Sequence, residues 1–307
     1  MRTRKPTLIV VLGPTASGKT ALAIQLAQLL STEIVNADSR QVYRELPIGS
    51  AAPSRAEQAL AKHYLVGQHS IQQRYSCGQF EQEALQVLND LFARLPVAIL
   101  CGGSMLYIDS VCNGISAFPE PNPALRAELT EQLEQKGPGY LAQRLKLLDP
   151  YSYATLDLRN GARLVRALEV SIQTGIPFSQ FKAQPAPPRP FDVIKVGLQL
   201  PLAQLEQRIA RRTQKMMDSG LPQEARALLP YRHLQALKAV GYPELFEHLL
   251  GHTTLDTALN SIRLHTRQYA KKQLTWWKRD HSIAWYHPDG AQQIFTDLLA
   301  RLPHAVL

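Results

Sequence analysis

The residues best suited to chemistry lie near the N-terminus, where residues 13–20 read GPTASGKT. The segment matches the pattern GxxxxGK[ST] at every fixed position, between a short apolar run and a helical pattern. In such a loop, backbone N–H groups wrap a phosphate, a lysine neutralises its outer oxygens and a threonine hydroxyl can ligate Mg²⁺. We therefore expect a di- or triphosphate and Mg²⁺, with Thr20 as the metal ligand and the phosphate held by Gly13, Pro14, Thr15, Ala16, Ser17, Gly18, Lys19 and Thr20.

A carboxylate stands at an unusual place for a nucleotide hydrolase. P-loop hydrolases usually hold Mg²⁺ with an acid that ends another hydrophobic strand, yet VAILC at 97–101 runs into Gly102, Gly103 and Ser104. An acid appears instead after the run 33–37, as Asp38. From the residues alone, Asp38 is a base acting on an acceptor, a magnesium-linked group or a helix N-cap, and Ser104 can likewise be only a cap.

These residues follow strand patterns that alternate with helical ones. Strands are predicted at residues 7–12, 33–37, 97–101 and 193–200, and helices at 18–30 and 80–94. Such alternation is typical of an α/β fold in which a parallel sheet carries helices on both faces. The P-loop between the first strand and helix makes the predicted fold P-loop NTPase-like.

Two proline-rich stretches bracket the middle of the chain. The first holds Pro119, Pro121 and Pro123, and the second holds Pro185, Pro187, Pro188 and Pro190. Residues 124–135 and 139–174 between them have helical periodicity. We predict a helical insertion domain at 117–190 within a P-loop core made of 1–116 and 191–307. On composition alone, the prolines also fit two surface loops of a single domain.

Composition places the chain among ordinary globular proteins. Of 307 residues, 45% are apolar and 19% charged, which excludes a disordered or collagen-like chain. The three cysteines, Cys77, Cys101 and Cys112, have no CxxC spacing and indicate neither a disulfide framework nor a zinc site. No apolar stretch approaches the roughly 20 residues of a membrane span. We expect a cytoplasmic protein without a membrane partner.

The charge distribution favours a polyanionic partner. Lys and Arg number 34 against 25 acids, giving a net charge of +9, and residues 191–307 hold 15 of the basic residues and 10 of the acidic ones. Arg263, Arg267 and Lys271 recur every fourth residue on a predicted helix, where like charges repel unless phosphates lie beside them. Trp276 and Trp277 on the same helix either stack on bases or, as is commoner for tryptophan, pack in the core.

Several motifs together resemble the tRNA dimethylallyltransferases, also called tRNA isopentenyltransferases. They occur in family order and span most of the chain. No cysteine follows Cys112, so the zinc finger of eukaryotic members is absent and the bacterial type is implied. The motifs are GPTASGKT at 13–20, NADSRQVYRELPIGSAAPS at 36–54, GGSMLYI at 102–108, RLVRALEV at 163–170, VGYPE at 240–244 and RQYAKKQLTWW at 267–277.

The resemblance implies transfer of a dimethylallyl group from dimethylallyl diphosphate to N6 of the adenosine at tRNA position 37, with release of diphosphate. A carboxylate that accepts a proton from the amine raises its reactivity, and Asp38 matches the family's aspartate. Ser104, where members commonly carry Thr, matches a polar group near the reacting centre. Arg212 matches a residue that assists the leaving diphosphate. The implied partners are dimethylallyl diphosphate and the anticodon stem-loop of tRNA, bound by a monomer.

The resemblance also implies a set of tRNA-binding positions. The target base is normally stacked in its loop, so it must be extruded into a pocket to be reached. The matching residues are Asp38, Ser39, Arg40, Gln41, Ser104, Arg126, Ala162, Arg163, Leu164, Val165, Arg166, Val240, Gly241 and Tyr242.

Three other functions share parts of this pattern. An adenylate isopentenyltransferase uses the same phosphate site on a free nucleotide, and the basic helical insertion argues against it. A P-loop small-molecule kinase would place ATP in residues 13–20 and an alcohol next to Asp38. An RNA-binding protein with a purely structural P-loop would tolerate the loss of Asp38, which is present.

Overall fold

A parallel sheet forms the centre of the computed structural model, which describes residues 5–115, 118–183 and 187–302. Within these residues all strand pairs are parallel. The predicted α/β fold is therefore confirmed. In spatial order the strands are β3 (His63–Tyr64), β2 (Ile34–Asn36), β4 (Val97–Gly102), β1 (Thr7–Leu12), β5 (Asp192–Leu198) and β6 (Ile283–Tyr286).

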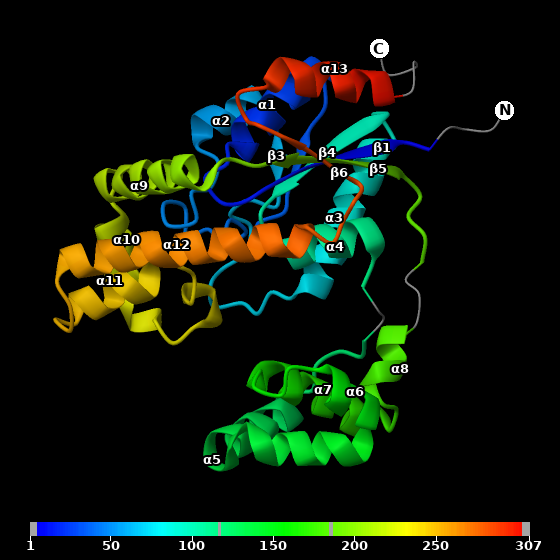
Figure 1. The fold of residues 1–307 in the computed structure, drawn as a ribbon, viewed down its shortest axis with the longest axis vertical. Coiled ribbons are helices and arrows are strands. Elements are labelled where there is room, and N and C mark those ends of the chain that lie inside the picture. The colour runs from blue at the N-terminus through cyan, green and yellow to red at the C-terminus, as the bar shows by residue number, and fades with distance from the viewer. Residues whose placement is uncertain (1–4, 116–117, 184–186, 303–307) are drawn as a thin grey trace. The chain divides into compact units, whose positions relative to one another are not determined.

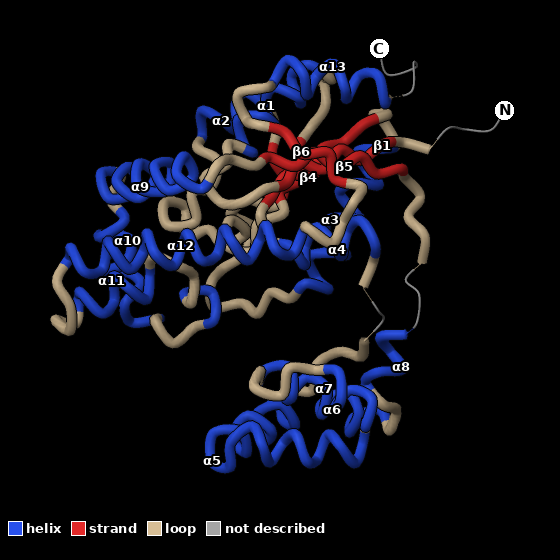
Figure 2. Tube along the Cα trace, viewed as in Figure 1, coloured by secondary structure: helices blue, strands red, loops and turns tan. Residues whose placement is uncertain are grey.

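Helices cover both faces of this sheet, as Figures 1 and 2 show. On one face lie α1 (Lys19–Leu29) and α13 (Ala291–Arg301), and on the other lie α3 (Cys77–Phe92) and α4 (Met105–Asn113). The strands alternate between the two cores: Leu8 and Val10 pack with α3 and α4, whereas Ile9 and Val11 pack with α1 and α13. Near-continuous apolar strands such as TLIVVL are required because both faces are buried.

A third cluster of apolar side chains joins the end of β2 to the C-terminal half of the chain. It contains Val42 and Leu46 from the loop after β2, and Leu221, Tyr242 and Ile262 from three helices. The helices of this region are α9 (Leu202–Asp218), α10 (Leu221–Leu228), α11 (Tyr242–Leu249) and α12 (Leu255–Trp277). One further short helix, α2 (Arg55–Leu60), lies between β2 and β3 in the sequence.

The chain divides into two compact units: a core unit (Met1–Cys112 and Arg189–Leu307) and an insertion unit (Asn113–Pro188). Pro185 lies outside the described residues. The insertion unit consists of α5 (Pro123–Leu148), α6 (Pro150–Thr155), α7 (Gly161–Thr174) and α8 (Phe178–Ala183). Its own core is formed by Leu129, Leu141, Leu145, Leu164 and Leu168.

The helical segment 139–174 is broken more often than its periodicity indicates. Helix α5 continues across residues 136–139 with a kink at Gly137, whose φ is 76°, and ends before Asp149. Asp149 then caps α6 and Asn160 caps α7, each by accepting a hydrogen bond from a backbone N–H. Throughout the described ranges, no helix has the length and apolar character to cross a membrane.

Candidate active site

The carboxyl ends of three neighbouring strands bring the predicted chemical groups together. The P-loop follows β1, Asp38 follows β2, and Ser104 follows β4, which lies between them. In parallel sheets, ligands bind at this edge because the loops that leave it converge. The strand before Asp38, β2, is therefore separated from the strand before the P-loop, β1, by β4. Asp38 and the P-loop nevertheless lie at the same edge of the sheet.

The P-loop has the backbone of an anion cradle. Gly13 has a φ of 149°, and a Cβ there would lie 2.5 Å from the carbonyl oxygen of Leu198. Ala16 holds a φ of 64°, a strained value for a residue with a side chain. Because this chain path turns amides outward, the N–H groups of Ala16, Gly18, Lys19 and Thr20 make no hydrogen bond to any described residue. They can therefore bind phosphate oxygens.

Two further features of the loop favour an anionic ligand. The Lys19 ammonium donates a 2.7 Å hydrogen bond to the carbonyl of Pro14. The Ser17 hydroxyl is buried and has no hydrogen-bond partner among the described residues. A buried polar atom without a partner is costly, and a bound phosphate would relieve that cost.

The charges around the loop are predominantly positive. Burial, together with the Arg212 guanidinium, lowers the pKa of Lys19 to about 8, against the attraction of the Asp38 carboxylate. Burial also lowers the pKa of Arg212, against the attraction of Asp38. Two half-buried cations thus lie near one carboxylate, and a diphosphate would stabilise both cations.

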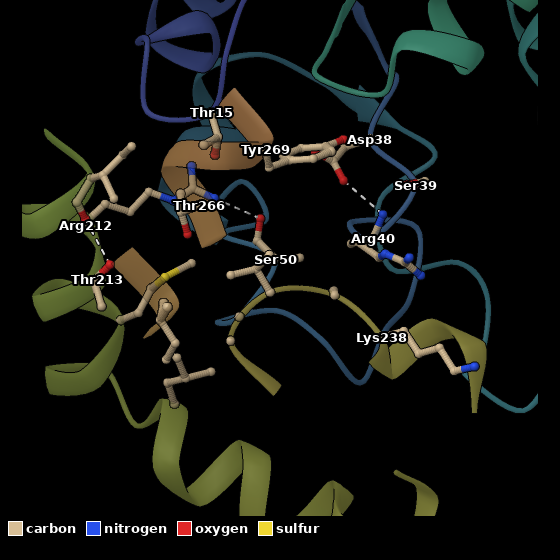
Figure 3. Close-up of a pocket in the computed structure, with 18 residues that line it drawn as sticks. Thr15, Asp38, Ser39, Arg40, Ser50, Arg212, Thr213, Lys238, Thr266 and Tyr269 are labelled. Carbon is tan, nitrogen blue, oxygen red and sulfur yellow. Dashed lines mark hydrogen bonds between the residues drawn. The ribbon is translucent and has the colours of Figure 1, made fainter. Parts of the chain in front are cut away.

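Asp38 uses only one of its two carboxylate oxygens within the protein. Its Oδ1 accepts hydrogen bonds from the backbone N–H of Arg40 at 2.9 Å and of Gln41 at 3.4 Å. These bonds close a turn, and no helix begins after Asp38, so the helix N-cap interpretation is wrong. Oδ2 has no hydrogen-bond partner among the residues described. In Figure 3 the carboxylate lies by the Tyr269 ring, and both residues line the same cavity. Oδ2 is thus the oxygen that can accept a proton.

Ser104 acts on the loop that carries Asp38. Its hydroxyl accepts a 2.8 Å hydrogen bond from the backbone N–H of Ser39, and its own N–H donates to the carbonyl of Ala37 at 3.2 Å. The side chain is buried and is not part of the cavity wall. Ser104 therefore holds residues 37–39 in place from the end of β4, and its hydroxyl proton remains available to donate.

The cavity beside Asp38 has a volume of about 220 Å³. All of its walls come from the core unit, as Figure 3 shows. Its polar wall contains Thr15, Asp38, Ser39, Arg40, Ser50, Arg212 and Thr266. Its apolar wall contains Ile209, Met216, Leu221, Val240 and Ile262. A ligand with a charged end and a hydrocarbon end fits such a cavity.

Helix α9 directs two arginines towards the strand ends. Arg212 lines the cavity and its Nη2 lies 3.4 Å from the carbonyl oxygen of Ser50. Arg208, one turn earlier, lies 3.4 Å from the carbonyl oxygen of Ser17 and 3.3 Å from Oδ1 of Asp289. The side chain of Arg212 is therefore placed where charge on a diphosphate would develop.

Several residues predicted to touch tRNA have structural roles in the core unit instead. The Gln41 side chain is buried and donates to the carbonyls of Ser50 and Ala51, and the buried Tyr242 hydroxyl donates to Glu224 at 2.7 Å. The polar groups of these two side chains thus hold loops around the cavity. Val240 and Gly241 line the cavity.

Arg40, in the same set, is also engaged. Its Nη1 donates to the carbonyls of Gln235 and Ala236, each at 3.2 Å. This tie connects the loop after β2 to the segment before α11, and it leaves Ser39 and Arg40 on the cavity wall.

The predicted positions in the insertion unit fall into two groups. Leu164 and Val165 have their side chains buried in its apolar core, so only their backbone is left for a contact with tRNA. Arg126 and Arg166 both form ion pairs with the fully buried Glu169, in the second case at 2.7 Å. Ala162 and Arg163, in the first turn of α7, are exposed.

Sequence reasoning missed several residues of the site. Tyr269 and Thr266 of α12 line the cavity, and Gln273 of the same helix bonds to the P-loop. Glu224 accepts hydrogen bonds from the N–H groups of Ile48 and Gly49 and thereby fixes the cavity rim. The polar residues at helical spacing within RQYAKKQLTWW were the available signal for Tyr269 and Gln273.

The basic stripe of α12 is only partly free. Arg267 pairs with Glu206 at 2.6 Å, whereas Lys271, Lys272, Lys278 and Arg279 are exposed. Trp277 is buried in the core and the Trp276 indole N–H donates to Asp109 at 2.8 Å, which favours the packing interpretation of both. Over the described ranges, no cluster of His, Cys, Asp and Glu could hold a metal by itself.

Comparisons with known proteins agree on one family. The model of the family described as IPP transferase matches residues 41–280. The chain is 45% identical over 290 residues to tRNA dimethylallyltransferase 2 of Porphyromonas gingivalis, covering 94% of this chain and 97% of that protein. It is 43% identical over 300 residues to tRNA dimethylallyltransferase 1 of Bacteroides thetaiotaomicron, covering 97% of each.

Solved structures show the same fold. The crystal structure of a tRNA isopentenylpyrophosphate transferase from Bacillus halodurans superposes with a TM-score of 0.71 at 28% identity, over 97% of this chain and 96% of that one. A eukaryotic dimethylallyltransferase acting on tRNA superposes with a TM-score of 0.84 at 24% identity, over 97% of this chain and 80% of that one.

Proposed function

The chain belongs to the tRNA dimethylallyltransferase family, that of the IPP transferases, and from this premise we propose that it prenylates tRNA. The donor is dimethylallyl diphosphate, and the acceptor is N6 of the adenosine at position 37, next to the anticodon. The observation that carries the proposal is a single cavity lined by the P-loop residue Thr15, by Asp38 and by Arg212. A phosphate cradle, a base and a cation thus serve one reaction space.

The proposed reaction is a displacement at the first carbon of the allyl group. The N6 nitrogen forms a bond to this carbon while the bond from the carbon to the diphosphate oxygen breaks, and the electron pair leaves with the diphosphate. The nitrogen then carries a surplus proton, which Oδ2 of Asp38 accepts. Since Oδ1 is held by two backbone N–H groups, the carboxylate presents Oδ2 in a fixed orientation.

The leaving group is held by the P-loop amides, Lys19 and Arg212. Negative charge grows on the diphosphate as the carbon–oxygen bond breaks, and Arg212 lies close enough to Lys19 to lower the pKa of the lysine. Their interaction with the departing diphosphate therefore strengthens in the transition state, which lowers the barrier. The apolar wall of Ile209, Met216 and Leu221 suits the hydrocarbon end of the donor.

Mg²⁺ fits this arrangement as a companion of the diphosphate. The Thr20 hydroxyl makes no hydrogen bond to a described residue, so it can serve as one ligand, and Mg²⁺ usually takes its remaining ligands from phosphate oxygens and water. When bound, the ion would neutralise charge on the diphosphate.

Two sets of basic residues are proposed to bind the tRNA backbone. The first is the exposed set on α12 and just after it, with Lys271, Lys272, Lys278 and Arg279. The second is in the insertion unit, where Arg163 is exposed and Glu169 holds Arg126 and Arg166.

We also propose that one chain suffices for the reaction, since the cavity is lined by a single core unit. We further propose that the enzyme works in the cytoplasm, where free thiols such as its three cysteines persist.

The acceptor class separates this function from its alternatives. The purified protein is incubated with Mg²⁺, dimethylallyl diphosphate and either unmodified tRNA or AMP, and the nucleosides are analysed by mass. Prenylated adenosine from tRNA and none from AMP is the expected result. Prenylated AMP would instead indicate an adenylate isopentenyltransferase, and transfer to neither acceptor would contradict the proposal.

A further inference from the structure

One buried side chain joins two loops of the site that are far apart in the sequence. Gln273 of α12 is 1% exposed. Its Oε1 accepts a 2.9 Å hydrogen bond from the backbone N–H of Thr15 in the P-loop, and its Nε2 donates a 2.7 Å hydrogen bond to the carbonyl of Gly103. Both ends of the amide are thus used by backbone groups, from two different strand ends.

The two partners flank the chemistry on both sides. Thr15 lines the cavity and precedes the amides that bind phosphate. Gly103 precedes Ser104, which holds the backbone of Ser39 next to Asp38. A shift of the Gln273 amide would therefore move the phosphate cradle relative to the loop that orients the base. Because one residue contacts both loops, it can set the distance between donor and acceptor.

The surroundings leave this amide little freedom. A Cβ on Gly103 would lie 2.7 Å from Nε2 of Gln273, so only glycine permits the approach. The helix is fixed by Ala270 and Trp277, both buried, at positions three before and four after Gln273. A side chain packed in this way keeps its rotamer without a ligand, as a positioning residue must.

We propose that Gln273 is a positioning residue, which fixes the P-loop and the Ser104 loop in the register that the transfer requires. It touches neither substrate, and it acts through Thr15 and Gly103. The effect of Gln273 on the transfer reaction rests on the proposed function. Its effect on phosphate binding does not, because that effect requires only that the amide joins the P-loop backbone at Thr15 to the Gly103 carbonyl.

Substitution of Gln273 by glutamate should weaken diphosphate binding in a way that low pH reverses. A neutral glutamic acid can accept from Thr15 N–H and donate to the Gly103 carbonyl, as glutamine does, whereas a carboxylate has no proton to donate and faces the Gly103 oxygen. At pH 8 we expect Gln273→Glu to bind inorganic diphosphate about 10- to 100-fold more weakly than the wild type. As the pH falls to about 5.5, the ratio of the two dissociation constants should approach one, because burial raises the pKa of a carboxyl group.

Calorimetric titration of inorganic diphosphate with Mg²⁺ measures both proteins at each pH. The control is Gln268→Glu, which places the same charge on an exposed position of α12 and should bind like the wild type at every pH. Gly103→Ala provides a second route, since its Cβ displaces the amide, and it should weaken binding at every pH. Circular dichroism shows whether each variant is folded.

Turnover separates positioning from packing. Gln273→Glu at pH 8 should raise KM for dimethylallyl diphosphate by the same factor as the binding loss, while its affinity for tRNA stays within about twofold of the wild type. Wild-type binding by Gln273→Glu at pH 8, or a loss that persists unchanged at low pH, overturns the inference. Failure of the wild type to prenylate tRNA would remove the proposed function, yet the diphosphate titration would still decide the role of Gln273.

Discussion

The hydroxyl of Ser104 accepts a 2.8 Å hydrogen bond from the backbone N–H of Ser39. This bond joins the end of β4 to the end of β2, and Ser39 follows the residue that we assign as the base. The resemblance to the family implies that Ser104 is a polar group near the reacting centre, and the geometry shows that it also supports the loop of Asp38. Several predictions depend on this distinction between groups that react and groups that hold them.

Replacing Ser104 should slow turnover without weakening donor binding. Ser104→Ala leaves the half-buried N–H of Ser39 without its partner, at a cost of about 1 kcal/mol. We expect kcat to fall about tenfold or more, with KM for dimethylallyl diphosphate unchanged. Ser104→Thr restores the hydroxyl and should recover most of the rate. Steady-state kinetics of the three proteins measure this, and a raised donor KM with normal kcat would point to substrate contact instead.

Two substitutions of Asp38 distinguish the role of Oδ1, which accepts backbone hydrogen bonds, from that of Oδ2, which we assign as the base. Asp38→Asn keeps an Oδ1 that accepts from Arg40 N–H but loses the basic oxygen, so turnover should fall about 100-fold or more while thermal stability is retained. Asp38→Ala also loses the turn hydrogen bonds to the N–H groups of Arg40 and Gln41, so its free energy of unfolding should fall by about 1 kcal/mol. Chemical denaturation and single-turnover transfer measure the two effects. Normal turnover in Asp38→Asn would remove the carboxylate from the mechanism.

Diphosphate binding should depend on the protonation of Lys19. Its pKa of about 8 in the free protein is lowered chiefly by burial, and a bound diphosphate favours the ammonium form. Affinity is therefore full below pH 8 and falls as the pH rises through 8, and binding above that pH takes up a proton. Lys19→Arg keeps its charge and should show no such fall. Titrations in buffers of different ionisation enthalpy measure the proton uptake, and its absence at pH 9 would contradict the assignment.

The insertion unit should lose stability when Glu169 is neutralised. Burial disfavours its charge, yet hydrogen bonds from Arg126 and Arg166 outweigh this and hold its pKa below the usual value. Its contribution to stability is thus present above the pKa of the unfolded chain and lost as the pH falls through the folded value. Glu169→Gln should cost about 3 kcal/mol at pH 7. The stability difference between the two proteins should be full at pH 7 and should shrink only as the pH falls below about 4.5 towards the lowered folded pKa. Denaturation curves over an acid pH series measure this, and a difference that does not change with pH would argue against an ionised Glu169.

Arg163 offers a test of tRNA contact through salt dependence. Its side chain is exposed in the first turn of α7. If it neutralises one phosphate, Arg163→Ala should reduce the slope of log affinity against log salt by about one. Arg94→Ala removes the same charge from a residue paired with Glu33 and should leave the slope unchanged. Filter binding across a salt series measures both, and an unchanged slope in Arg163→Ala would remove this contact.

The parts of the fold that sequence could predict are those with local causes. Continuous apolar residues identify the strand TLIVVL, and glycine and lysine at fixed spacing identify the P-loop. The helix after the P-loop is identified by its apolar periodicity. Strands β3 and β6 were missed because they are short and lie at the sheet edges, where HY and IAWY carry no distinctive pattern. Their pairing depends on neighbours far along the chain rather than on their own residues.

The site itself divides in the same way. Asp38 and Lys19 were predictable because each lies next to a recognisable strand or motif. The role of Gln273 was not, since its partners Thr15 and Gly103 lie 258 and 170 residues away. Family resemblance also could not show that the side chain of Leu164, within a motif that matches a tRNA-facing segment, lies in the core of the insertion unit.

The most direct test of the account is to locate the product within a tRNA. An unmodified transcript with adenosine at position 37 and a second with guanosine there are incubated with dimethylallyl diphosphate and Mg²⁺, then digested and analysed by mass. The account predicts that a dimethylallyl group replaces one hydrogen of the position-37 adenosine in the first transcript, that the second stays unmodified, and that Asp38→Asn modifies neither at an appreciable rate. Prenylation elsewhere in the tRNA, or equal transfer by Asp38→Asn, would contradict it.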